Sequence, residues 1–106
     1  MCGICGEFKF ISKSFDHEKL NNLMDSISAR GNDSKGSYMD DDVFLGHHRL
    51  AIIDTSEKSN QPMRVGKHVI VFNGVIFNYQ ELRTALIKKG HSFSSSGDTE
   101  VIIRSY

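Results

Sequence analysis

The chain contains no tryptophan and only one proline among its 106 residues, and it has no long hydrophobic run. Its longest apolar stretches, such as residues 69–72, are far too short to cross a lipid bilayer. It also has no excess charge, because lysine plus arginine and aspartate plus glutamate each number 13. General binders of nucleic acid or of membrane surfaces need a basic excess, so neither partner is expected. A hydrophobic share of 39% is typical of a small globular domain.

Cysteine is also scarce, with one residue at position 2 and one at position 5. The N-terminus lacks the basic stretch and apolar run of a secretory signal peptide, so we expect a cytoplasmic protein without structural disulfides. Cys2 and Cys5 do form a C-x-x-C pattern, for which a redox pair and half of a zinc site are the alternatives. A structural zinc site needs about four ligands, and the five histidines show no paired spacing. We therefore predict no metal site.

The most informative residue present is Cys2, which directly follows the initiator Met1. Met1 can be removed when the next side chain is small, which would leave a thiol and a free α-amine on one residue. An α-amine titrates at about pH 7.7–8.0, close to the range where a general base is most useful. Cys2 could thus supply both a nucleophile and the base that activates it. The alternative is an inert, buried cysteine at the start of a strand.

Hydrophobic periodicity and turn-forming residues predict an alternation of strands, helices and loops. Apolar residues at helical spacing predict a helix over residues 17–29, capped by Asp16 or Ser14. A second helix is expected to begin with a capping box at Asn78 and to end before Gly90. Strands are expected at residues 3–10, 43–54 (interrupted at 47–49), 69–72 and 75–77, and loops at 30–34, 58–67 and 94–97.

The last predicted helix begins near Asp98 or Thr99 and stays apolar almost to the end of the chain. No glycine, proline or polar tail closes this helix. A natural domain rarely finishes inside its own apolar helix. We therefore expect the chain to be the N-terminal part of a longer protein.

Six short motifs follow one another along the chain. They are MCGI at residues 1–4, RGND at 30–33, GHHRLAIID at 46–54, NQPM at 60–63, FNGVIFNYQELR at 72–83 and GDTEVI at 97–102. Each motif alone is weak, but together and in this order they resemble the glutaminase domain of asparagine synthetases. These domains are class II glutamine amidotransferases and belong to the N-terminal nucleophile hydrolases. The resemblance covers the whole chain.

The resemblance implies an α/β (α+β) fold, the four-layer αββα sandwich in which two antiparallel sheets lie between helices. By the same resemblance, residues 1–106 are about the first half of the glutaminase domain, and its remainder and an ATP-using synthetase domain are absent. Half a sandwich should expose a broad apolar face, so this fragment alone could be unstable, associated or inactive.

The resemblance also implies a catalytic mechanism. Cys2 would attack the side-chain amide of glutamine, and its α-amine would relay the proton. The side-chain amide of Asn73 and the backbone N–H of Gly74 would stabilise the oxyanion that forms. An Asn-Gly pair suits this task because glycine permits close approach of the backbone. Without the other motifs, Asn73-Gly74 would be interpreted as an ordinary hairpin turn.

The glutamine-binding residues are also implied by the resemblance. Arg49 would hold the α-carboxylate, since a guanidinium matches a carboxylate better than an ammonium does. Asp98 would meet the α-ammonium, although an aspartate at a helix start can equally be an N-cap. The rest of the implied binding set is Leu50, Ala51, Ile52, Ile53, Asn73, Gly74 and Val75. The alternative for Arg49 is a solvated surface arginine.

Some positions depart from the family pattern. The family usually has glutamate where this chain has Val75, and that glutamate helps to bind the substrate ammonium. Without that glutamate, Asp98 has less help in binding the substrate ammonium, which suggests a divergent member of the family. The family also has proline where this chain has Asn32. His48, beside Arg49, occupies a position that varies in the family, so we assign it no catalytic role.

The implied function is hydrolysis of glutamine to glutamate and ammonia for the amidation of aspartate to asparagine by a C-terminal domain. ATP and magnesium are expected in that domain, and no cofactor is expected in this chain. The partners are then glutamine and the synthetase domain, and a homodimer is compatible with this prediction. The alternatives are an amidotransferase that acts on a sugar or polysaccharide precursor, a degenerate non-catalytic domain, and the redox or metal module of Cys2 and Cys5.

Overall fold

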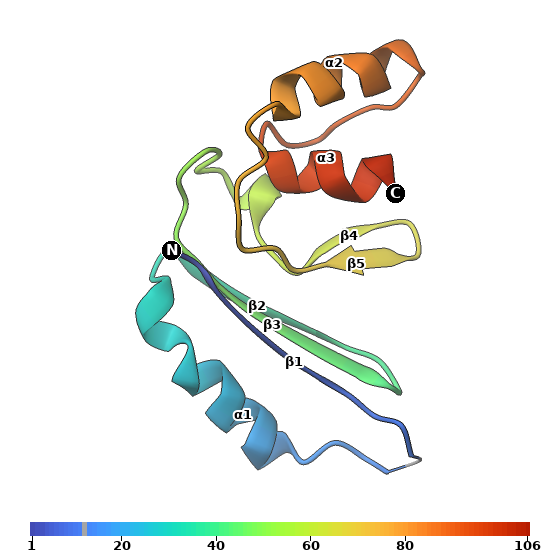
Figure 1. Ribbon diagram of the computed structural model, residues 1–106. Helices are drawn as coiled ribbons and strands as arrows, with labels where there is room; N and C mark the ends of the chain where they lie inside the picture. The colour runs from blue at the N-terminus through green and yellow to red at the C-terminus, as the bar shows by residue number, and fades with distance from the viewer. Residues whose placement is uncertain (12) are drawn as a thin grey trace.

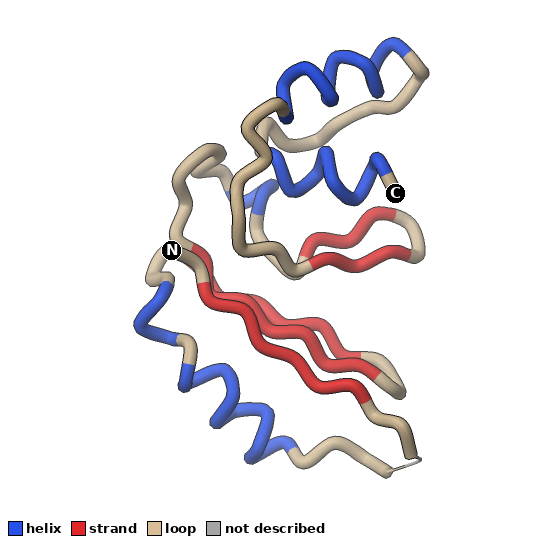
Figure 2. The backbone as a smooth tube through the Cα atoms, in the orientation of Figure 1, coloured by secondary structure: helices blue, strands red, loops and turns tan. Residues whose placement is uncertain are grey.

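The computed structural model describes residues 1–11 and 13–106. In this part of the chain two antiparallel sheets form, one in the order β1-β3-β2 and the other from β4 and β5 (Figure 2). The strands are β1 (Gly3–Phe8), β2 (Ser34–Met39), β3 (Val43–Arg49), β4 (Met63–Val65) and β5 (His68–Ile70). The central strand β3 places Gly3 opposite His48, and Ser34 opposite Arg49. The start of β1 therefore lies beside the end of β3.

The elements are arranged in layers (Figure 1). Helix α1 (His17–Ser26) covers one face of the first sheet, and the β4-β5 hairpin lies over the other face. Helix α3 (Asp98–Ser105) packs on this hairpin, and α2 (Tyr79–Lys88) packs on α3. Short 3-10 turns follow at Ser28–Arg30 (η1) and Glu57–Ser59 (η2). The predicted mixed α/β fold with antiparallel sheets is confirmed, and its layer order agrees with part of an αββα sandwich.

Local sequence explains the positions of the helices. The Asp16 carboxylate caps α1 by accepting hydrogen bonds from the backbone N–H groups of Glu18 and Lys19. Leu20, on the apolar side of α1, is buried. Gly46 in β3 allows this close packing, because a Cβ there would collide with the sulfur of Met24.

Helix α2 ends as predicted and begins differently. Gly90 has a φ of 95°, and the N–H groups of Gly90 and His91 bond to the carbonyls of Ile87 and Leu86. This is the Schellman arrangement for which glycine is suited. The capping box at Asn78 is wrong, because Asn78 makes no side-chain cap hydrogen bond.

The strands differ more from expectation than the helices do. β3 continues through His47, His48 and Arg49 and ends there, whereas residues 50–54 are not a strand. β5 ends at Ile70, and no strand flanks Asn73-Gly74, so this pair is not a hairpin turn. β2 and β4 were not predicted, because their side chains are mixed and pairing with neighbouring strands defines them.

Several large apolar side chains remain on the surface. Phe10, Phe77 and Tyr106 are 90%, 95% and 92% exposed. Across the described part of the chain, no helix has the length and apolar character needed to span a membrane.

Candidate active site

One pocket gathers most of the residues that the sequence singled out. Its lining residues come from the N-terminus, the end of β3, the loop after β3 and the loops before α2 and α3. Of the implied site residues, its lining contains Cys2, Arg49, Leu50, Ile52, Ile53, Asn73, Gly74, Val75 and Asp98. Ala51 is not in this lining, and its backbone N–H donates to the Asp33 carboxylate at 2.6 Å. Segments far apart in the sequence thus form one cavity.

The Cys2 thiol lies against the backbone of Leu50. The Leu50 N–H points at the Cys2 sulfur with a nitrogen–sulfur distance of 3.3 Å, and the Leu50 carbonyl oxygen is 3.5 Å from the same sulfur. The Arg30 side chain donates from Nε to the Cys2 carbonyl at 3.0 Å. Met1, also in the lining, is 69% exposed. Cys2 is therefore held from both sides, while the residue whose removal would free its amine is accessible.

Cys5 belongs to a different environment from Cys2. Its sulfur lies 3.7 Å from the sulfur of Met24 on α1, and burial raises the pKa of its thiol. Successive side chains of a strand point to opposite faces. Cys2, three positions before Cys5, therefore points to the pocket side, and the two thiols do not form a pair.

Arg49 is not a solvated surface arginine, since it is only 7% exposed. Its Nη1 donates to the Ser56 carbonyl at 2.7 Å and to Oδ1 of Asn60 at 2.8 Å. Its Nη2 donates to the Asp54 carbonyl. A guanidinium carries five N–H groups. Arg49 can therefore make these three hydrogen bonds to the loop after β3 and still donate to a ligand. The sequence did not predict that Arg49 stabilises this loop.

Residues of the RGND motif contact both Cys2 and Arg49. Arg30 holds Cys2, as described above. Gly31 packs so closely on the backbone of Arg49 that a Cβ would collide with it. The Asp33 N–H donates to the Arg49 carbonyl at 2.9 Å. The turn-forming composition of this motif predicts a loop, but only the tertiary structure shows that residues of this segment contact Cys2 and Arg49.

Gln61 connects the segment that carries Asn73 and Gly74 to α3. Its Oε1 accepts from the Phe72 N–H at 2.5 Å, and its Nε2 donates to Thr99 Oγ1 at 3.2 Å. Gln61 is buried and lines the pocket. Gly74 lets the Phe72 ring pack on its backbone, because a Cβ would lie 2.8 Å from Cζ of that ring and would force it to shift. These contacts bring the Asn73-Gly74 backbone to the wall of the pocket.

Asp98 does not cap its own helix. The N-cap of α3 is Gly97, and the Asp98 carboxylate instead accepts the Ile76 N–H at 3.0 Å. Asp98 is buried and lines the pocket. Oδ2 ties α3 to the segment after Gly74, and within the described residues Oδ1 has no hydrogen bond that would compete with a cationic ligand group.

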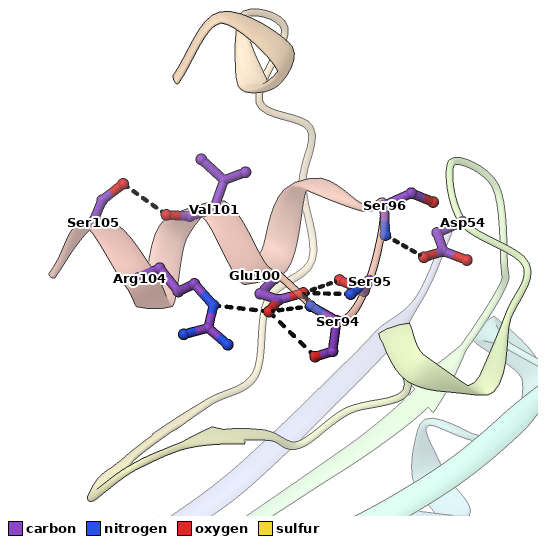
Figure 3. Close-up of polar contacts among 8 residues, drawn as sticks. All are labelled: Asp54, Ser94, Ser95, Ser96, Glu100, Val101, Arg104 and Ser105. Atoms are coloured by element: carbon purple, nitrogen blue, oxygen red, sulfur yellow. Dashed lines mark hydrogen bonds and ion pairs between the residues drawn. The ribbon is translucent and has the colours of Figure 1, made fainter. Parts of the chain in front are cut away.

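Two buried carboxylates hold the serine-rich loop before α3 (Figure 3). Glu100, 1% exposed, accepts backbone N–H bonds from Ser94 and Ser95 and a bond from Arg104 Nε at 2.8 Å. Burial raises its pKa, but the hydrogen bonds from Ser95, Ser94 and Arg104 outweigh this effect and hold the pKa at about 2. Asp54 accepts the Ser96 N–H at 2.8 Å from the other side. The loop that leads to Asp98 is thereby fixed at both ends.

The low pKa of Glu100 predicts an acid-sensitive fold. Its folded pKa of about 2 lies below its ordinary value of 4.5, so its stabilising effect is complete above pH 4.5 and is lost as the pH falls toward 2. The shift corresponds to about 3 kcal/mol. Glu100→Gln should lower the free energy of unfolding by about 2–3 kcal/mol at pH 7 and flatten its decline below pH 4.5. Urea unfolding at several pH values measures both, and the exposed Glu81→Gln serves as the control.

The histidines near Arg49 do not line the pocket. His48 lies on the α1 side of β3, with Nδ1 3.3 Å from the Gly31 carbonyl oxygen. His47 is fully buried, burial lowers its pKa, and neither of its ring nitrogens has a hydrogen-bond partner within residues 1–11 and 13–106. Neither ring is placed to act on a ligand in the pocket.

Comparison with known proteins provides independent information. Residues 1–106 match the family described as the glutamine amidotransferase domain. The chain is 37% identical over 112 residues to asparagine synthetase (glutamine-hydrolyzing) 3 of Bacillus subtilis, which covers 100% of this chain and 18% of the relative. It is 34% identical over 108 residues to asparagine synthetase (glutamine-hydrolyzing) of Zea mays, with coverage of 100% and 18%.

A relative with a different name is amidase chry2 of Gibberella zeae. It is 36% identical over 94 residues, which cover 84% of this chain and 14% of the relative. The chain therefore spans less than a fifth of the length of each of these relatives.

Proposed function

The chain belongs to the glutamine amidotransferase domain family, and we propose that its pocket hydrolyses glutamine to glutamate and ammonia. The observation that carries this proposal is the single pocket lined by Cys2, Arg49, Asn73, Gly74 and Asp98. A nucleophile, an oxyanion site and two opposite charges are what hydrolysis of an α-amino acid amide requires.

In the proposed reaction, the Cys2 sulfur attacks the side-chain carbonyl carbon of glutamine. The thiol proton passes through the Cys2 α-amine to the amide nitrogen, while the Asn73 amide and the Gly74 N–H stabilise the oxyanion. The C–N bond breaks, ammonia leaves and a γ-glutamyl thioester remains on Cys2. Water then cleaves the thioester, which releases glutamate and restores the thiol. Because Met1 acylates the Cys2 nitrogen, Met1 must be removed before this relay can operate.

We propose the same binding roles as the sequence implied. Arg49 holds the α-carboxylate and Asp98 the α-ammonium, and residues 50–53 line the cavity with Val75. Val75 brings no charge to the ammonium, so Asp98 alone provides the negative charge from this pair of positions. The fixed loops on either side hold these groups apart before glutamine enters.

We further propose that residues 1–106 are the N-terminal part of a glutaminase domain within a longer, cytoplasmic protein. A C-terminal domain with ATP and magnesium would use the ammonia to amidate aspartate. Relatives named asparagine synthetase (glutamine-hydrolyzing) support asparagine as the product. The free thiols of Cys2 and Cys5 suit a reducing compartment. Val75 is the observation that favours a second candidate, a divergent acceptor such as a sugar or polysaccharide precursor.

Labelling of the full natural protein with a diazoketone analogue of glutamine tests the proposal. We expect intact mass to show loss of Met1 and one label on Cys2, blocked by excess glutamine. Ammonia release from glutamine should disappear in step with labelling. A protein that has lost Met1 yet neither takes up the label nor releases ammonia would instead be a degenerate, non-catalytic member.

A further inference from the structure

We propose that Asp54 is a positioning residue that sets the separation of Arg49 and Asp98 and thereby makes the pocket selective for an α-amino acid with both α-groups. This inference rests on the proposed function of the pocket. Asp54 is 8% exposed and itself lines the pocket, close to the two charged residues.

Asp54 connects two walls of the pocket. The first wall is the end of β3 with Arg49, and the second is the loop before α3 that leads to Asp98. Its backbone carbonyl accepts a hydrogen bond from the Arg49 guanidinium. Its carboxylate Oδ2 accepts the N–H of Ser96 at 2.8 Å, two residues before Asp98 (Figure 3). One residue is therefore bonded to the cationic side chain and to the loop that leads directly to the anionic one.

The two walls also pack tightly where Asp54 joins them. A Cβ at Gly97 would lie 3.0 Å from Ser59 Oγ and 3.4 Å from the Asp54 Cβ. Ser59 Oγ in turn donates to Asp54 Oδ2 at 2.8 Å. No side chain separates the loops at this point, so a change in the Asp54 contacts moves one wall relative to the other.

Protein donors already occupy both oxygens of the Asp54 carboxylate. Ser56 N–H donates to Oδ1 at 2.8 Å, and Ser96 and Ser59 donate to Oδ2. The bonds from Ser56, Ser96 and Ser59 hold its pKa well below the usual range despite burial. An ionised carboxylate makes charge-assisted, short hydrogen bonds that resist displacement. Asp54 therefore acts through Arg49 and Asp98 and leaves the ligand to them.

The ligand explains why this separation matters. An α-amino acid carries its carboxylate and its ammonium on one carbon, so the distance between these groups is fixed. Arg49 and Asp98 can bind both groups together only at a matching separation. A wall that shifts by a fraction of an ångström weakens the second contact and leaves the first one largely intact.

Asp54→Asn in the full natural protein tests the inference. The substitution keeps the shape but replaces one acceptor oxygen with an NH₂ group that cannot accept the N–H bonds. The probes are glutamine and 4-carbamoylbutanoate, which has the same amide and carboxylate but no α-ammonium. We expect kcat/KM for glutamine to fall on the order of 10-fold, chiefly through KM, with kcat/KM for 4-carbamoylbutanoate nearly unchanged.

The ratio of the two kcat/KM values separates positioning from general damage. A parallel loss with both substrates, which leaves the ratio as in the wild type, overturns the inference. If Asp54→Asn does not fold, Ser59→Ala removes one donor to the same carboxylate and should lower the ratio in the same direction. Asp40→Asn is the matched control, because the Asp40 carboxylate also accepts two backbone N–H bonds but lies in the β2–β3 turn. A wild-type protein that releases no ammonia refutes the proposed function itself.

Discussion

Replacement of Cys2 by alanine is expected to reduce ammonia release from glutamine at least about 10³-fold, because no other group in the pocket is placed to form the thioester. The fold should be unaffected, since within residues 1–11 and 13–106 the hydrogen bonds of the thiol are to the Leu50 backbone and the thiol fills little volume. We expect the free energy of unfolding to change by less than about 1 kcal/mol. Ammonia release and diazoketone labelling measure the first effect, and urea unfolding measures the second.

Cys5→Ser is the matched control for this experiment. Its thiol faces Met24 on the other side of β1, and its raised pKa makes it a poor nucleophile. The variant should keep the label and the activity. Loss of labelling in Cys5→Ser together with retention in Cys2→Ala would assign the reactive thiol to Cys5 and contradict the proposed mechanism.

Replacement of Arg49 by methionine should damage both binding and stability. Two charge-assisted hydrogen bonds to a carboxylate, each contributing about 1.5–2 kcal/mol, correspond to about 10²–10³-fold in kcat/KM for glutamine. Because the carboxylate does not react, the loss should appear mainly as a higher KM. The free energy of unfolding should fall by about 3 kcal/mol, since the Asp54 carbonyl, the Ser56 carbonyl and the Asn60 side-chain oxygen each lose one hydrogen bond.

The two effects can be measured separately. Kinetics with glutamine and with a primary amide that lacks the α-carboxylate separate ligand binding from loop support, and urea unfolding gives the stability. Arg64→Met is the control, because Arg64 is exposed and its Nε donates to the nearby Gly66 carbonyl at 3.3 Å. If the free energy of unfolding falls while the KM for glutamine stays at the wild-type value, Arg49 stabilises the loop after β3 and has no part in binding.

The local sequence was sufficient for the features that depend on neighbouring residues. Asp16 and the apolar spacing after it predict α1, and Gly90 predicts the end of α2, because caps and helical faces are formed by residues one to four positions apart. Cys2 and the six ordered motifs led to the family, because a nucleophile and its binding loops retain short, recognisable stretches of chain.

The tertiary structure decided the features that depend on distant partners. β2 has no clear apolar alternation and exists because it pairs with β3, and β3 continues through His47, His48 and Arg49 because strands on both sides accept its hydrogen bonds. Arg49 itself is fixed by carbonyls five and seven residues further along the chain. Asp54 reaches Ser96 across 42 positions, and Gln61 reaches Thr99 across 38. Residue types identify what chemistry the pocket can perform, but hydrogen bonds between remote segments determine which side chains hold it in place.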